Sequence, residues 1–341
     1  MVSPLSTPIR TPIRTPNLAA LALAAGLTAT AGVPAAHAAQ PDTYPSRPIR
    51  LIVAYPTGGI SDTVARALGD QLTAQMGASV VVENRAGAGG SIGIDAVAKA
   101  APDGYTIGFA STSPLTLNPH VGRVNYDPRR DIAPVMSVMY SPVLVVATQA
   151  FTGQSFPDLI AQSRAKPGSV RWATSGLGTV GHVMLEQVRA KSKADVTLIP
   201  YKGGGQQMND ALGGQFEVMS TNASPQLTGQ MQAGKLRAIA VGAPKRIESL
   251  PNVPTMAELG FPKANLTSTF GVFAPGKTPP AIVNRLNAEL NKALASPEVR
   301  ERLLRDGEVP TGGTAAQFAA SIHAEYDDNA RIVKEAGIKA D

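Results

Sequence analysis

Four short glycine-rich segments carry the clearest chemical signal in the sequence, because each stands between a predicted strand and a predicted helix. They cover residues 56–60, 86–90, 175–179 and 202–205. Glycine has no Cβ, so its backbone N–H groups approach a ligand closely, and the helix that follows begins with partial positive charge. Such a turn is typical of an anion site. One turn alone is more often a simple helix cap, but two matched pairs favour a shared cleft.

Strands and helices alternate around these turns. The predicted strands cover residues 49–54, 79–83, 105–110, 170–174, 196–201 and 216–220. The helix after the first turn is predicted to begin with Ser61 as its N-cap, and further helices are predicted at 92–99, 180–191 and 281–295. Near-continuous apolar strands between amphipathic helices are typical of a mostly parallel sheet covered on both faces. The sequence therefore predicts an α/β protein in which one unit of strands and glycine turns occurs twice, as two lobes.

The first forty residues are predicted to lie outside this fold. Arg10 and Arg14 precede an apolar run from Leu18 to Leu27, and Ala36-His37-Ala38 supplies a small-x-small cleavage site. This pattern is typical of a secretory signal peptide, here residues 1–38, so we expect export to the periplasm. Cleavage would lower the formal net charge from +6 to +4. A mild excess of scattered cations suits a small anion and does not indicate nucleic-acid binding.

Several kinds of chemistry are excluded or disfavoured. The chain has no cysteine, which excludes disulfides and thiolate metal sites. Gly176 to Gly181 forms a G-x-G-x-x-G motif, but the next strand ends in Tyr201-Lys202 and lacks the acidic residue that a dinucleotide site needs. No hydrolase motif stands out, and we predict a binding protein with neither metal nor cofactor. His182 follows a glycine turn, where it either faces the cleft or is a hydrogen-bonded helix residue.

A set of longer motifs is similar to the Bug-type receptors of tripartite tricarboxylate transporters. The resemblance runs from about Tyr44 to Lys339. The matching motifs are Tyr44-Pro45-x-Arg47-Pro48-Ile49-Arg50, Glu83-Asn84-Arg85-x-Gly87-Ala88-Gly89-Gly90, Pro102-Asp103-Gly104-Tyr105, Tyr126-Asp127-Pro128, Pro200-Tyr201-Lys202-Gly203, Gly234-Lys235-Leu236-Arg237-Ala238 and Leu250-Pro251-x-Val253-Pro254-Thr255.

This resemblance implies a two-lobed periplasmic binding protein of type II that closes on its ligand by a hinge motion. Lobe 1 would be residues 44–144 plus 268–341, and lobe 2 residues 145–267, with crossings near 142–147 and 267–275. It also implies capture of a small carboxylate (a C4-dicarboxylate, a tricarboxylate or an aromatic acid) and its delivery to two integral membrane permease subunits. We expect a monomer. The alternatives are a sensor that signals to a membrane kinase and an exported α/β enzyme.

The resemblance also implies the ligand-binding residues, which lie in the glycine loops and at the ends of neighbouring strands. They are Tyr55, Pro56, Thr57, Gly58, Gly59, Ala86, Gly87, Ala88, Gly89, Ser111, Ser113, Thr174, Ser175, Gly176, Thr179, His182, Tyr201, Lys202, Gly203 and Thr221.

Three positions depart from the usual pattern of the family. Thr57 replaces a proline and adds a hydroxyl group, Phe270 replaces a tryptophan, and Thr221 replaces an aspartate that many members carry. Without that aspartate, a ligand ammonium group would lack a buried counter-ion. We therefore expect a plain carboxylate rather than an amino acid as ligand.

Overall fold

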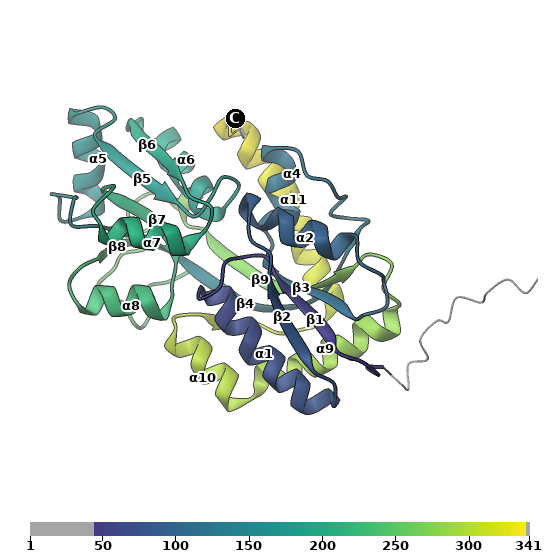
Figure 1. Cartoon of the computed structure of the whole chain (residues 1–341). Helices are drawn as coiled ribbons and strands as arrows, with labels where there is room; N and C mark the ends of the chain where they lie inside the picture. Colours follow the sequence, from purple (N-terminus) through teal and green to yellow (C-terminus); the bar gives the residue numbers. More distant parts are fainter. Residues whose placement is uncertain (1–43, 339–341) are drawn as a thin grey trace, which may run out of the picture. The chain divides into compact units, whose positions relative to one another are not determined.

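The computed structural model describes residues 44–338, so the predicted signal peptide at residues 1–38 lies outside the described part. The strands form one sheet in the order β2-β1-β3-β9-β4-β7-β5-β6, and β8 and β10 also pair with β4 (Figure 1). The strands are β1 (Ile49–Val53), β2 (Val80–Asn84), β3 (Thr106–Ser111), β4 (Ile132–Ala147), β5 (Val170–Thr174), β6 (Val196–Pro200), β7 (Val218–Asn222), β8 (Arg237–Gly242), β9 (Thr267–Pro275) and β10 (Val309–Pro310).

Helices connect and cover these strands. The α-helices are α1 (Ile60–Met76), α2 (Ser91–Ala98), α3 (Ser113–Thr116), α4 (Asn118–Val121), α5 (Phe156–Ala165), α6 (Val180–Ser192), α7 (Gly204–Leu212), α8 (Pro225–Gln232), α9 (Pro280–Ala295), α10 (Pro297–Arg305) and α11 (Ala315–Ala336). Two 3₁₀ turns are η2 (Ala88–Gly90) and η3 (Pro262–Ala264). The predicted α/β class is confirmed, and each predicted strand is present within two residues of its expected ends.

The strand directions are more mixed than the sequence predicts. β1 pairs in parallel with β2 and β3, and β5 pairs in parallel with β6 and β7. The pairs formed by β4 and β9 are antiparallel. The parallel pattern therefore holds for the outer strands, whereas the central strands run back against them.

Strand β4 changes its partners along its length. It pairs with β9 from Ile132 to Pro142, and with β7 and β8 from Val143 to Ala147. The sheet therefore has two parts. We call β1, β2, β3, β9, β10 and β4 up to Pro142, with the helices and loops attached to them, the first part. We call β5 to β8 with the rest of β4, and the helices and loops attached to them, the second part.

Helices cover both faces of each part. In the first part, α1, α9 and α10 pack on one face around Leu68, and α2 and α11 pack on the other around Ile94. In the second part, α5 and α6 pack around Trp172, and α7 and α8 pack around Met208 on the opposite face. Each cluster is apolar and buried, and such burial is the main stabilising term in folding. Rigid layers thus hold the loops at the strand ends.

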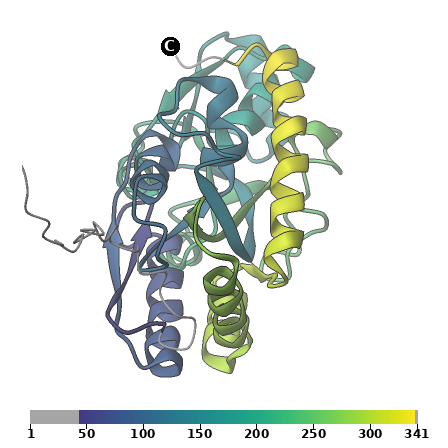
Figure 2. The same ribbon diagram turned by 90° about the vertical axis from the view of Figure 1, so that its right-hand side faces the viewer.

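Two helices show how local sequence sets the ends of elements. Helix α1 begins after Gly59, not after Ser61, so the prediction of Ser61 as N-cap is wrong. Ser61 is a buried residue of the first turn, and Asp62 accepts a hydrogen bond from the N–H of Gly58 at 3.0 Å instead. Helix α11 begins with a capping box formed by Thr314 and Gln317, and it appears end to end in Figure 2.

The end of α11 also contacts helix α6 of the second part. Leu117 and Val121 of the α3–α4 corner, Val183 of α6, and Val333 and Ile338 at the end of the chain form one small apolar cluster. This cluster joins segments from both parts beside the glycine loop at 175–179.

Candidate ligand-binding site

A cavity of about 200 Å³ lies where the strand ends of the two parts meet. The loops after β1, β2 and β3 line it from the first part, and those after β5, β6 and β7 line it from the second. Strands β4 and β9 contribute Val143, Ser268 and Phe270. Ligands of open α/β sheets bind at such carboxyl ends of strands. The four glycine turns singled out in the sequence all contribute to this one cavity.

Helices α1, α6, α7 and α8 begin at the cavity. The first turns of α1, α6, α7 and α8 contribute Ile60, Ser61, Val180, Gly181, Gly204, Gly205, Ser224 and Gln226 to its lining. The first N–H groups of a helix have no partner within the helix, and the dipole makes this end partly positive. Four such ends around one small volume favour an anion.

The side-chain charge of the lining also favours an anion. Lys202 is the one charged residue among the described residues that line the cavity, and neither Asp nor Glu is among them. Lys202 is exposed, so its contribution is screened by solvent. The site therefore offers partial positive charge from the backbone and one solvated cation.

Two hydroxyl groups lie in the wall that the first part forms. The Tyr55 hydroxyl group and Ser111 Oγ are hydrogen-bonded to each other. Burial raises the pKa of Tyr55, so its hydroxyl group stays neutral. Phe270 lies edge-on to Tyr55, with ring centroids 6.1 Å apart, and it also stacks on Phe109. Phe270 thus provides an apolar surface beside the uncharged hydroxyl pair of Tyr55 and Ser111.

Most of the residues predicted from the sequence lie in this lining. They are Tyr55, Pro56, Thr57, Gly58, Gly59, Gly87, Gly89, Ser111, Ser113, Ser175, Thr179, Lys202, Gly203 and Thr221.

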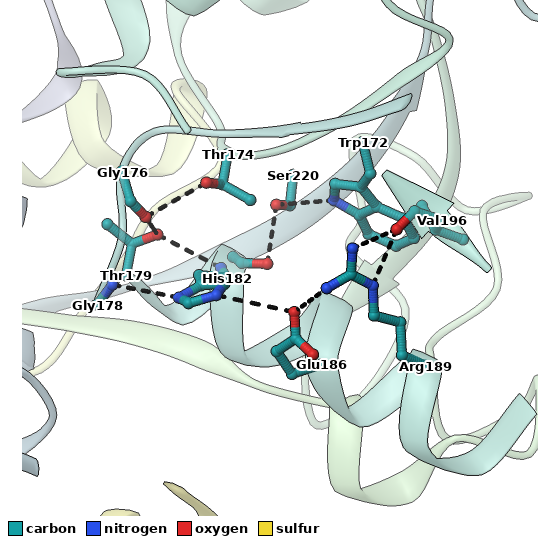
Figure 3. A network of polar contacts seen from close by, with 11 residues as sticks. Trp172, Thr174, Gly176, Gly178, Thr179, His182, Glu186, Arg189, Val196 and Ser220 are labelled. Atoms are coloured by element: carbon teal, nitrogen blue, oxygen red, sulfur yellow. Dashed lines mark hydrogen bonds and ion pairs between the residues drawn. The ribbon is translucent and has the colours of Figure 1, made fainter. Parts of the chain in front are cut away.

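Six predicted residues lie outside the lining: Ala86, Ala88, Thr174, Gly176, His182 and Tyr201. Three of them hold the loops through side-chain hydrogen bonds. Thr174 Oγ1 donates to the carbonyl oxygen of Gly176 at 3.3 Å, and the Tyr201 hydroxyl group donates to Asp210 at 2.7 Å. His182 is buried behind the loop at 175–179 (Figure 3). Of the two interpretations left open for His182, the structure supports the hydrogen-bonded helix residue.

One wall of the cavity is formed by the end of β7, the start of α8 and the two central strands. In this wall, sequence reasoning predicted Thr221 as a ligand-binding residue and missed Val143, Ser220, Asn222, Ala223, Ser224, Gln226, Ser268 and Phe270. The turn between β7 and α8 contains no glycine, so the glycine pattern does not indicate it. Its signal is Ser224-Pro225, an N-cap followed by proline at the first helical position.

The two parts touch at two points beside the cavity. A Cβ added to Gly89 would lie 2.8 Å from the carbonyl oxygen of Leu177, and one added to Gly203 would lie 2.7 Å from Pro56 Cγ. Gly89 and Pro56 belong to the first part, and Leu177 and Gly203 to the second. The loops therefore meet where side chains larger than hydrogen do not fit.

The described residues contain neither a cluster typical of a metal site nor a helix that could span a membrane. In residues 44–338, no cluster of three or more His, Asp or Glu side chains has the arrangement of a metal site. Within the same range, no helix combines the length and the apolar character needed to cross a membrane.

Comparison with known proteins agrees with this geometry. The chain is 40% identical to Protein BugT of Bordetella pertussis over 316 residues, which cover 91% of this chain and 95% of the relative. The R. palustris protein Rpa4515, solved with adipate, superposes with a TM-score of 0.82 at 32% identity, over 87% of this chain and 99% of that one. MatC of Rhodopseudomonas palustris, solved with bound malate, superposes with a TM-score of 0.80 at 28% identity, over 85% of this chain and 100% of that one.

The family model described as tripartite tricarboxylate transporter family receptor matches residues 64–338, which include the second to fourth glycine loops and both central strands. With this match and the 40% identity to BugT, the chain belongs to the tripartite tricarboxylate transporter receptor family.

Proposed function

We propose that this receptor is exported to the periplasm, captures one small carboxylate between two lobes and delivers it to a permease of two integral membrane proteins. The proposed lobes are residues 44–144 with 268–341, and residues 145–267. In this proposal the protein acts as a monomer, uses neither metal nor cofactor, and releases its ligand chemically unchanged.

The observation that carries the proposal is the convergence of four helix N-termini on one cavity. Helix α1 comes from the first part, and α6, α7 and α8 come from the second. Backbone N–H groups at helix ends bind carboxylates without a fixed cationic side chain. A ligand held from both parts would interact with the loops of each.

The lining also favours a plain acid over an amino acid. Thr221 lines the cavity at the position where many members of the family carry an aspartate, and no carboxylate side chain of the described residues lines it. A buried ammonium group without a counter-ion is costly. The relatives solved with adipate and with malate hold ligands of the proposed class.

The change of partners along β4 supports a hinge. Between Pro142 and Val143 the chain leaves the first part, and at Thr267 it returns along β9. Two extended crossing strands absorb a rotation of one lobe against the other through small backbone changes. A ligand that contacts both lobes favours the closed state by its differential affinity for that state.

A thermal-shift screen of the secreted protein against a panel of carboxylates tests the proposal. An acid present at about 100 times its dissociation constant should stabilise the fold by roughly 2.7 kcal/mol. The acid recovered after denaturation should be unchanged. A panel that gives no shift, or an acid recovered as a different compound, would contradict the receptor role. N-terminal sequencing of the same protein checks cleavage after Ala38.

A further inference from the structure

We propose that His182 is a positioning residue of the ligand site, which in its neutral form holds the glycine loop at 175–179 in the shape that the cavity requires. This inference rests on the proposed function, because the loop affects binding only if the cavity takes the ligand.

The side chain of His182 is hydrogen-bonded to the loop and does not line the cavity. The N–H of Gly178 donates to His182 Nδ1 over 3.3 Å, and the residue is 3% exposed (Figure 3). A backbone N–H can only donate, so Nδ1 must carry a lone pair. The ring proton of neutral His182 therefore resides on Nε2.

The other side of the ring favours the same tautomer. Nε2 lies 3.8 Å from Glu186 Oε1. The carboxylate of Glu186 also pairs with Arg189, which in turn donates to the carbonyl oxygen of Val196. A carboxylate facing Nε2 favours a proton there. One ring thus links the loop to an ion pair that is anchored on β6.

Burial keeps the ring in this neutral state. Burial, together with the nearby positive charge of Arg189, lowers the pKa of His182 to about 4. Protonation of Nδ1 would remove the acceptor for the Gly178 N–H and place an N–H group of the ring against it. The neutral ring is the form that can hold the loop.

Two hydroxyl groups also hold the loop, one from within it and one from the end of β5. Thr179 Oγ1 donates to the carbonyl oxygen of Gly176 at 2.8 Å, and Thr174 Oγ1 donates to the same oxygen from the end of β5. Both hydroxyl groups donate to Gly176 rather than to Gly178. His182 is therefore the side chain that holds the far end of the loop.

The far end of the loop is the end that meets the first part of the sheet. A Cβ added to Gly178 would collide with the side chain of Asn118, and the adjacent Leu177 carbonyl oxygen faces Gly89. Asn118 in turn donates to the carbonyl oxygen of Ala88, in the opposite glycine loop, at 3.1 Å. Displacement of Gly178 would therefore disturb the contact between two loops that form the cavity.

A pair of amide variants separates positioning from general stability. His182→Asn places an oxygen where Nδ1 lies, so it can still accept from Gly178. His182→Gln extends the amide by one carbon, toward the place of Nε2, and leaves Gly178 without an acceptor. Both variants are polar and uncharged, so burial of a polar amide affects them alike.

The first measurement is the affinity for the acid that stabilises the wild-type protein most in a panel with malate, adipate and citrate. His182→Gln should bind it about tenfold more weakly, as expected for the loss of one buried hydrogen bond, and His182→Asn should stay within roughly threefold of wild type. Equal affinities for the two variants would overturn the proposal.

The second measurement needs no ligand. The ¹⁵N chemical shifts of the wild-type imidazole should show the proton on Nε2, and a proton on Nδ1 would overturn the proposal even if neither variant folds. In folded His182→Gln, the Gly178 amide should exchange its proton about ten times faster than in wild type. If no acid binds the wild type, the proposed function fails, whereas these spectra still decide whether His182 holds Gly178.

Discussion

Gly203 and Pro56 meet across the ligand cavity, where a Cβ on Gly203 would stand 2.7 Å from Pro56 Cγ. Gly203 is the N-cap of α7, and its φ of +154° lies in a region that L side chains rarely adopt. Pro56 lies in the loop between β1 and α1. The two parts are thus in contact at a point where residue 203 must be glycine.

Replacing Gly203 by alanine should weaken ligand binding by about tenfold or more, because the new methyl group keeps α7 away from Pro56. The backbone strain costs about 1–3 kcal/mol as well. Gly234→Ala is the matched control, since Gly234 has φ +69° and no atom lies within 4 Å of an added Cβ. Both variants should melt earlier, but only Gly203→Ala should show a higher dissociation constant in calorimetry. Equal affinities would contradict a contact needed for closure.

Lys202→Met should weaken the binding of a carboxylate by roughly two- to fivefold, since Lys202 is exposed and its charge is screened. The difference from wild type should shrink as the salt concentration rises from about 20 to about 300 mM. Lys245→Met removes an exposed lysine outside the lining and should leave the affinity unchanged. An effect of Lys202→Met that does not depend on salt would point to a packing role instead.

Thr221→Asp should weaken the binding of a plain acid by at least about tenfold, because it places a negative charge in a lining that favours anions. Thr221→Asn has nearly the same size without the charge and should bind within roughly threefold of wild type. Competition assays with malate and aspartate measure the change in preference. If Thr221→Asp binds malate as well as Thr221→Asn does, the uncharged wall does not determine the ligand class.

Because Glu308 is buried, the free energy of unfolding should depend on pH. Glu308 is 1% exposed, Ser141 donates to its Oε1 at 2.8 Å, and Oε2 has no hydrogen-bond partner within the described residues. Burial raises the pKa of Glu308 well above 4.5. The folded state therefore holds this proton at a pH where the unfolded chain has lost it, and Glu308 lowers stability as the pH rises above about 4.5.

Glu308→Gln removes this titration. Relative to wild type, its free energy of unfolding should rise with pH between about 5 and 8, by up to about 1.4 kcal/mol per pH unit until the folded-state pKa is passed. Urea unfolding of both proteins across this range measures the difference. Parallel stability curves would show that Glu308 is ionised in the folded protein.

Local pattern was enough to predict the outer elements. The glycine turns indicated the places of α1 and α6, and β2 lies within one residue of the strand predicted at 79–83. These signals depend on neighbours in the sequence, so they survive without knowledge of the tertiary contacts. The same is true of the loops that carry most of the cavity lining.

The central strands could not be predicted in this way. β4 is apolar on both faces, and it pairs with β9, more than a hundred residues later in the chain. The partner change after Pro142 leaves no periodic signal. Asn222 and Ser268 were missed for the same reason, since those side chains meet only after β7 and β9 have paired with β4. His182 was ambiguous because helical spacing alone does not show on which side of a loop a ring lies.

The most direct test is a crystal structure of the protein with the carboxylate that binds it most tightly. The proposed ligand site requires a carboxylate group within hydrogen-bond distance, directly or through one water, of backbone N–H groups at 57–61 or 87–90. It also requires contacts from 175–181 or 202–205 to the same molecule. An acid bound in another place, for example in the separate cavity beside Phe261 and Lys263, would contradict it.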